Sequence, residues 1–143
     1  MSPEELKAKA TQFIEEVINQ GNLERFTDFF TADYVDHVPP PTPDFPTGAE
    51  GFKAFFGGLR AAFPDFHYTL DDTIVEGDKV VQRVTGHGTM KNAFMGMPAT
   101  GKHAMWGEIH ISRVGAGGKF VEHWAIQDQL GMLQQLGLAP TPG

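Results

Sequence analysis

Apolar residues recur at helical spacing through the first half of the chain and predict three helices. The first covers 3–20 and begins with a capping box formed by Ser2 and Glu5. A short second helix follows and turns the ring of Phe30 inward. The third covers about 49–63 and is stopped by a proline, after a proline-rich stretch that is too stiff for regular structure.

The second half alternates between apolar and polar residues, which predicts strands. Four strands are expected, separated by glycine-rich turns, at 66–76, 80–90, 103–114 and 120–127. A last short helix is predicted between Asp128, placed as its N-cap, and Gly137, placed where a helix ends. Helices first and antiparallel strands after them indicate an α+β fold.

Length, charge and composition narrow the class of protein. The 143 residues suit one domain, 1–143, and the absence of cysteine excludes disulfides, thiol nucleophiles and thiolate metal sites. The formal net charge of −7 argues against nucleic acid and anionic membrane surfaces as partners. The acidic start lacks a signal-peptide pattern and no apolar run approaches a membrane span, so a cytoplasmic protein is expected.

The last predicted hairpin carries the candidate chemistry. An antiparallel register with Arg113 opposite Phe120 places His110 opposite His123 and gives the hairpin one polar and one apolar face. The polar face holds Trp106, Glu108, His110, His123 and Gln127, and the apolar face holds Ile109, Ile111, Trp124 and Ile126. Such alternation is ordinary for a sheet whose apolar face packs on helices and whose polar face is wet. Alternatively, the polar face lines a pocket and the apolar face packs against a second subunit.

Five short segments follow one another in an order that resembles a known family. They are 33–37 (DYVDH), 63–65 (FPD), 76–83 (EGDKVVQR), 96–102 (GMPATGK) and the strand and helix at 118–137. Together they resemble the SnoaL-like polyketide cyclases of the nuclear-transport-factor-two-like superfamily, over roughly the whole chain. The resemblance implies a cone-shaped α+β fold, in which a curved antiparallel or mixed sheet wraps around N-terminal helices.

The same resemblance implies that a polar-x-His pair and a His-x-Asp pair face a pocket from two strands. Glu108-x-His110 matches the first pair, and His123-x-Ala125 matches the second with alanine in place of the aspartate. The candidate base is therefore Glu108, whose carboxylate would lie opposite Ala125, or one of the two histidines. Asp128 either caps the last helix or replaces the aspartate, if the strand ends or bulges before it.

Other residues are candidates for binding the substrate. Arg83 and His87 share one face of their strand, and Arg83 either stabilises an enolate or forms a structural ion pair. His37 either rims the pocket or is structural. Aromatic candidates are Trp106, Trp124 and Phe55. Nucleotide-binding and nucleophile-elbow motifs are absent. No cofactor is expected, because the chemistry that the resemblance implies needs none. No metal is expected either, because ligands on one flat sheet face form a poor tetrahedral cage.

The activity that the resemblance implies is closure of a ring in a polyketide ester, by proton transfer at a carbon next to a carbonyl, without a cofactor. Two alternatives stay open: a non-catalytic carrier of a hydrophobic small molecule, and a hydrolase or isomerase on the same fold. If the polar face lines the pocket, the apolar face with Ile109 and Ile126 needs cover. A homodimer or a dimer of dimers is then expected.

Overall fold

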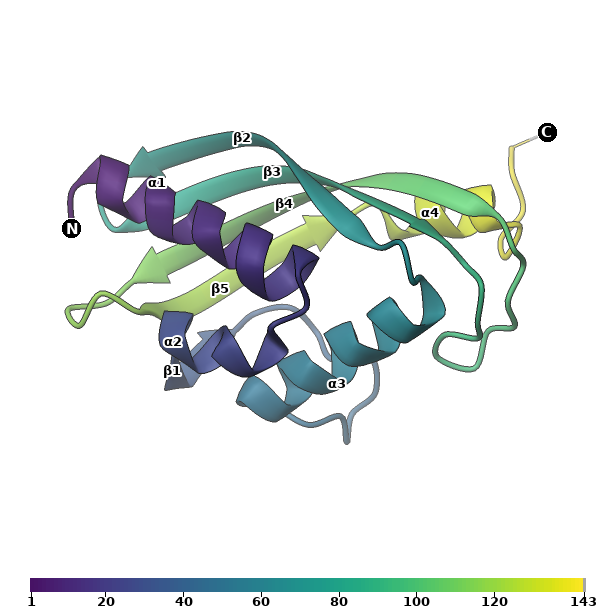
Figure 1. Cartoon of the computed structure of the whole chain (residues 1–143), viewed down its shortest axis with the longest axis horizontal. Coiled ribbons are helices and arrows are strands. Elements are labelled where there is room, and N and C mark those ends of the chain that lie inside the picture. The colour runs from purple at the N-terminus through teal and green to yellow at the C-terminus, as the bar shows by residue number, and fades with distance from the viewer. Residues whose placement is uncertain (143) are drawn as a thin grey trace.

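Five strands form one sheet in the computed structural model, which describes residues 1–142 (Figure 1). They are β1 (Phe30–Asp36), β2 (His67–Glu76), β3 (Lys79–Thr89), β4 (His103–Val114) and β5 (Phe120–Gln127). Their order across the sheet is β1-β5-β4-β3-β2. The alternating pattern predicted the last four correctly, with β4 and β5 at the expected residues and β2 and β3 within one residue of them.

The first strand, β1, is one that the sequence pattern does not predict. The pattern places Phe30 in the second short helix, but α2 (Phe26–Phe29) ends before it and Phe30 begins the strand. β1 lies at the edge of the sheet and pairs in parallel with β5 alone. An edge strand is partly exposed on both faces, so its alternation is weak. Its register places Asp36 beside His123.

The N-terminal helical region is longer and less regular than a single α-helix. α1 (Pro3–Gln12) continues into a π-helical segment, η1 (Phe13–Asn19), and a 3-10 turn at Leu23–Arg25 leads into α2. The predicted capping box is confirmed: Glu5 N–H donates to Ser2 Oγ over 3.1 Å and Ser2 N–H donates to Glu5 Oε1 over 2.9 Å.

The two remaining helices begin and end close to the residues that the sequence predicted. They are α3 (Gly48–Ala62) and α4 (Gln129–Leu136). Asp128 caps α4, since its Oδ1 accepts the N–H of Gly131 over 2.9 Å. Gly137 ends the helix with φ near +79°, in the left-handed region that glycine adopts without strain.

The helices cover one face of the sheet, called the inner face below. Figure 1 shows α1 in front of the sheet, α3 below it, and α4 at the end farthest from the N-terminus. Buried side chains form two apolar clusters, one with Ile18, Phe63 and Trp106 and the other with Leu6 and Phe120. In residues 1–142, no helix is both long enough and apolar enough to cross a membrane.

The pairing of β4 with β5 differs by two residues from the predicted register. His110 pairs with Ala125 rather than with His123. One residue of the shift arises at the turn, where Phe120 pairs with Val114, and the second is Val121, an extra residue that forms a bulge. A shift of two residues keeps each later side chain on its predicted face. Phe120 lies before the bulge, where the shift is a single residue, and its side chain is buried inside the fold, 2% exposed.

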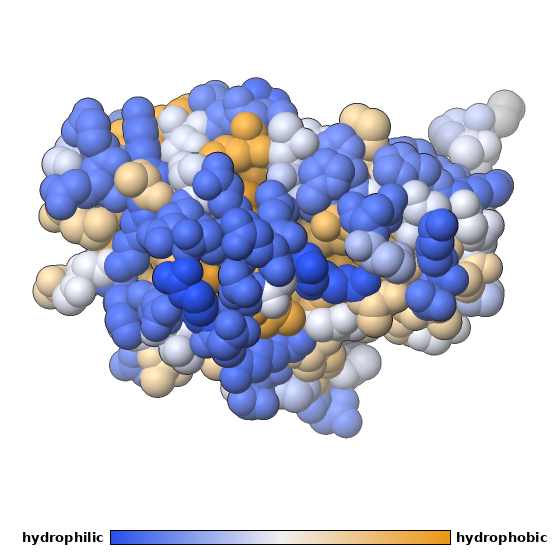
Figure 2. Space-filling view, in the orientation of Figure 1, coloured by the Kyte–Doolittle hydropathy of each residue, from blue (hydrophilic) through white to orange (hydrophobic). Residues whose placement is uncertain are grey.

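The outer face of the sheet carries large exposed apolar side chains, namely Ile74, Met105, Ile109 and Ile126. Ile126 is 81% exposed. In contrast, the helix-bearing side in Figure 2 is mostly hydrophilic, with only small apolar areas between polar side chains. The sheet therefore directs its polar band inward, the second of the two orientations considered from the sequence.

Candidate active site

A band of polar side chains crosses the inner face of the sheet between the two apolar clusters. Gln82 on β3 and Glu108 and Ser112 on β4 are its buried members. Burying such groups costs free energy unless each of them finds a hydrogen-bond partner. The partners of these groups therefore indicate what the band can do.

Glu108 is the most enclosed carboxylate of the band, with 5% of its side chain exposed. Its Oε1 accepts from Tyr68 Oη over 2.8 Å and from His110 Nε2 over 2.7 Å, and its Oε2 accepts from Trp106 Nε1 over 2.7 Å. Burial acts to raise the pKa of Glu108, but the hydrogen bonds and charge of His110, aided by Tyr68 and Trp106, outweigh burial and lower it. Glu108 is therefore ionised at neutral pH.

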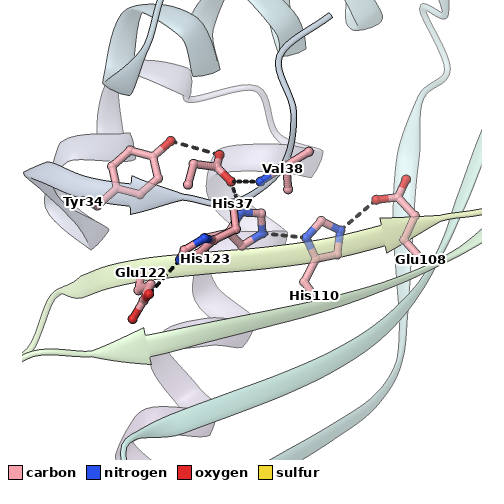
Figure 3. A network of polar contacts seen from close by, with 8 residues as sticks. Tyr34, His37, Val38, Glu108, His110, Glu122 and His123 are labelled. Carbon is pink, nitrogen blue, oxygen red and sulfur yellow. Dashed lines mark hydrogen bonds and ion pairs between the residues drawn. The ribbon is translucent and has the colours of Figure 1, made fainter.

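His110 and His123 form a hydrogen-bonded pair beside Glu108, as Figure 3 shows. Nδ1 of His110 lies 2.9 Å from Nε2 of His123, and the ring planes differ by 22°. Their side chains are 19% and 17% exposed, so solvent reaches both rings. The structure thus brings together the three residues that the hairpin pattern singled out.

Asp36 forms the other end of this hydrogen-bonded chain. Its Oδ1 lies 3.0 Å from His123 Nδ1 and accepts the N–H of Val38 over 3.0 Å, while Oδ2 lies 3.4 Å from Tyr34 Oη. Burial acts to raise the pKa of Asp36, but the hydrogen bond and charge of His123, with those of Val38 and Tyr34, lower it below its ordinary value. Asp36 is the most exposed member of the chain, at 37% of its side chain.

Sequence reasoning missed Asp36 and Tyr34, although both lie in the segment 33–37 that carries the family resemblance. The missed signal is their spacing of two, which places them on one face of a strand. The side chain of His37 therefore points to the opposite face. Its backbone N–H still pairs with β5, donating to the carbonyl oxygen of His123 over 2.8 Å.

Tyr68 is a second residue that the sequence reasoning missed. It lies on the inner face of β2, buried against Glu108. Burial and the neighbouring charge of Glu108 raise the pKa of Tyr68 well above its ordinary value, so the hydroxyl stays protonated and donates. A tyrosine at an inward position of a predicted strand indicates a buried hydroxyl that needs a partner. The sequence does not identify that partner, because Glu108 on β4 is forty residues away.

His37 and Trp124, predicted as substrate-binding residues, lie together on the outer face. Their rings stack with centroids 4.8 Å apart and planes that differ by 5°. His37 Nε2 lies 2.7 Å from Glu122, which also accepts from Arg113 Nε over 2.8 Å. This cluster is separated from the inner band by the thickness of the sheet.

Arg83 and His87 also point outward, away from the inner band. Arg83 Nη1 lies 3.7 Å from Asp71, the structural ion pair that the sequence left open. The ring of His87 stacks on His67 with centroids 4.5 Å apart, and its Nε2 lies 3.0 Å from Thr69 Oγ1. Neither residue contacts the chain from Glu108 to Asp36.

The remaining predicted residues are divided between the two faces. Trp106 belongs to the inner band through its hydrogen bond to Glu108. Phe55 lies on α3 and packs edge-on against Phe94, with ring centroids 6.0 Å apart. Asp128 acts as the N-cap of α4, and it also lines a surface hollow of about 370 Å³.

This hollow is a second place where predicted site residues meet. It is lined by Arg83, Gly107, Glu108, Ile109, Ile126, Gln127 and Asp128. Most of its surface is apolar, through the outward side chains of Ile109 and Ile126. Nowhere in residues 1–142 are three or more His, Asp or Glu side chains arranged to hold a metal ion.

Gln82 adds an unusual group to the inner band. It lies directly opposite His110 in the β3–β4 register and is 6% exposed. Its amide nitrogen has no hydrogen-bond partner among the residues that the structure describes. An unpaired buried donor costs about 1–3 kcal/mol, so native structures retain few of them. Its position beside the histidine pair suits a hydrogen-bond donor to a ligand.

Comparisons with known proteins agree with this fold. A family model described as SnoaL-like polyketide cyclase matches residues 8–136. Aklanonic acid methyl ester cyclase DnrD from Streptomyces peucetius is 30% identical over 129 residues, which are 89% of this chain and 88% of the relative. Two similar solved structures are TsrD from Streptomyces laurentii and IdmH, a putative polyketide cyclase from Streptomyces antibioticus.

The two structures match nearly the whole chain. TsrD is 29% identical with a TM-score of 0.84, over 97% of this chain and 99% of its own. IdmH is 33% identical with a TM-score of 0.78, over 92% of this chain and 98% of its own. These matches confirm the predicted α+β fold of the nuclear-transport-factor-two-like type.

Proposed function

Because the chain belongs to the SnoaL-like polyketide cyclase family, we propose that it closes a carbon ring in a polyketide ester by proton transfer next to a carbonyl. The relatives named for aklanonic acid methyl ester support an ester of this chemical class as the substrate. One observation carries the proposal: an unbroken chain of hydrogen bonds runs from buried Glu108 through both histidines to solvent-exposed Asp36.

Ring closure of the aldol type is a matter of moving one proton. A base removes a proton from a carbon next to a carbonyl, and that carbon attacks a second carbonyl group. The oxygen of the second carbonyl becomes an alkoxide and takes a proton back. No atom is gained or lost and no electron leaves the substrate, so the reaction calls for acid–base groups rather than a redox cofactor.

The hydrogen-bonded chain has the properties that such a reaction needs. Histidine is the side chain that most often acts as a general acid or base, and two histidines stand at the centre of this chain. Both oxygens of Glu108 already accept hydrogen bonds from buried or half-buried donors, so its role is to fix the proton and orientation of His110. The substrate then approaches the exposed end of the chain, near His123 and Asp36.

Gln82 is the group that we assign to the negative charge on the substrate oxygen. Arg83, the sequence-based candidate for this task, lies on the outer face and is paired with Asp71. The free amide N–H of Gln82 lies on the inner face opposite His110. A fixed donor with no partner among the described residues can stabilise a developing oxyanion without first having to break a hydrogen bond within the protein.

A turnover assay with a matched pair of histidine variants tests this function. The protein is incubated with a panel of polyketide methyl esters, and chromatography with mass detection follows a product of unchanged mass. We expect wild type and His87→Asn, on the outer face, to convert an ester, and His123→Asn to be slower by about 10²–10⁴-fold. Full turnover by His123→Asn would show that the inner band is not the working site.

Two alternatives are outcomes of the same assay. Ala125, in place of the family's aspartate, favours a carrier without catalysis, and stoichiometric binding of an ester without conversion would establish it. The outer hollow would be the site if Asp128→Asn abolished turnover while His123→Asn retained it.

We also propose that a second copy of the chain covers the outer face. Ile109 and Ile126 are 48% and 81% exposed there, and exposed apolar residues that gather on one face are typical of an interface. Covering them would leave the inner band free for the substrate. Light scattering should give the mass of a dimer or of a dimer of dimers at micromolar concentration, and a monomer would contradict this arrangement.

A further inference from the structure

The chain from Glu108 to Asp36 contains three contacts, and each contact requires one proton. Ionised carboxylates only accept, so His110 Nε2 and His123 Nδ1 carry hydrogens. The other two ring nitrogens lie 2.9 Å apart and share one hydrogen, because two lone pairs or two N–H groups would repel each other. The two carboxylates contribute −2 and the histidine pair contributes +1, which leaves a net charge of −1.

This count leaves one accessible oxygen that can accept a further proton. All four ring nitrogens are occupied within the chain, and both oxygens of Glu108 accept hydrogen bonds from enclosed donors. Asp36 differs from them, because 37% of its side chain is exposed. Its Oδ2 has a single long contact, 3.4 Å to Tyr34 Oη. A general base must come within hydrogen-bond reach of the proton that it removes, and the exposed side chain of Asp36 can be approached by a substrate.

The position of Asp36 also accounts for the alanine at residue 125. In the family pattern a carboxylate stands two residues after the histidine of β5, where this chain has Ala125. Asp36 reaches the same histidine from the neighbouring strand, since the parallel register pairs Asp36 with His123. The site thus keeps an accessible carboxylate next to His123, supplied by β1 instead of β5.

We propose that Asp36 Oδ2 is the base that removes the substrate proton, an assignment that rests on the proposed cyclase function. The C–H bond breaks, its electron pair remains on the substrate as an enolate, and an O–H bond forms on Asp36. After the new carbon–carbon bond forms, this O–H gives its proton to the alkoxide and Asp36 is ionised again. His123 and His110 orient Asp36 and place positive charge beside the enolate.

A deuterium exchange assay separates proton removal from ring closure. NMR follows the exchange of the protons next to the carbonyl of a β-keto ester in D₂O, with wild type, Asp36→Asn and Asp33→Asn. Asp33 is an exposed carboxylate of the same strand, outside the hydrogen-bonded chain, and serves as the matched control. We expect Asp36→Asn to lose about 10²–10⁴-fold in exchange rate, with Asp33→Asn unchanged.

Chemical rescue distinguishes a base from a residue that only supports the fold. In Asp36→Ala, added acetate should restore part of the exchange rate, because a free carboxylate can occupy the vacated position. Exchange at the wild-type rate in Asp36→Asn, or a loss in Asp36→Ala that acetate does not relieve, would overturn the assignment.

The role of Asp36 and the cyclase function can be refuted separately. Exchange by wild type without ring closure on any ester would refute the cyclase function and leave Asp36 as the base. Ring closure retained by Asp36→Asn would refute the role of Asp36 and leave the cyclase function standing.

Discussion

Glu108→Gln is the substitution that tests the buried end of the hydrogen-bonded chain. Glutamine keeps the shape of the side chain but removes its charge, and its amide group donates where the carboxylate accepted. With its oxygen towards Trp106, the new amide can donate to His110 Nε2, which reverses the tautomer of that ring. The histidine pair then holds two protons instead of three and becomes neutral, while His123 still donates to Asp36.

The size of the effect follows from the three hydrogen bonds to Glu108. A bond to a charged group contributes about 1.5–3 kcal/mol and a neutral one about 0.5–1.5, so three bonds lose about 3–4 kcal/mol together. Removing a buried charge restores part of this free energy, so the free energy of unfolding should fall by about 1–3 kcal/mol in total. Glu108→Ala should destabilise the fold more than Glu108→Gln does. It leaves Tyr68 and Trp106 as buried donors without acceptors, and each such donor costs about 1–3 kcal/mol of stability.

Urea unfolding followed by tryptophan fluorescence measures these losses, since Trp106 contacts the mutated group. The matched control is Glu122→Gln, which removes an outer-face carboxylate held by Arg113 and His37. We expect the control to lose less stability and to keep the wild-type exchange rate. Glu108→Gln should slow exchange about 10–100-fold, because positive charge beside the enolate is lost. Wild-type stability and rate in Glu108→Gln would refute the reasoning about this chain.

Three further predictions concern the unpaired amide of Gln82, the dependence of stability on pH, and the apolar outer face. Gln82→Met removes an unpaired donor, so the free energy of unfolding measured in urea should rise by about 1–2 kcal/mol while turnover falls. A loss of stability would mean that the amide already has a partner. Folding lowers the pKa values of Asp36 and Glu108, so the stability they contribute is present above about pH 4.5 and is lost as the pH falls through the lower folded values. Unfolding free energies measured against pH should show this drop, and Glu108→Gln should reduce it. Ile126→Asp should give a monomer by light scattering with its fold intact; an unchanged mass would place the interface elsewhere.

The sequence was informative wherever local periodicity decides the structure. Alternation located the strands from β2 to β5, and the caps at Asp128 and Gly137 set the ends of α4. The polar face of the last hairpin was also predictable, even though the register was wrong by two residues. A shift by an even number of residues leaves each side chain on its face, so Glu108, His110 and His123 still converge.

The apolar and polar pattern could not predict which strands pair when they lie far apart in the sequence. β1 is an edge strand in parallel pairing with a strand some ninety residues later, so nothing local indicates its partner. Asp36 was missed for that reason, and Tyr68 because its contact with Glu108 on β4 reaches across β3, which lies between the two strands. The faces of His37 and Phe120 depend on a strand and a bulge that periodicity did not locate. Arg83 lies in a strand that was predicted, but the alternation did not show which face of that strand turns inward.

One measurement addresses the central claim, that Asp36 and the histidine chain catalyse ring closure. Wild type and Asp36→Asn are incubated with a polyketide ester in D₂O. The products are separated by chromatography and their masses are measured by mass spectrometry, and binding of the ester to each protein is measured in parallel. Wild type should form a ring-closed isomer of the ester, and Asp36→Asn should bind the ester but leave it unchanged. Equal conversion by the two proteins, or binding without conversion by wild type, would contradict the central claim.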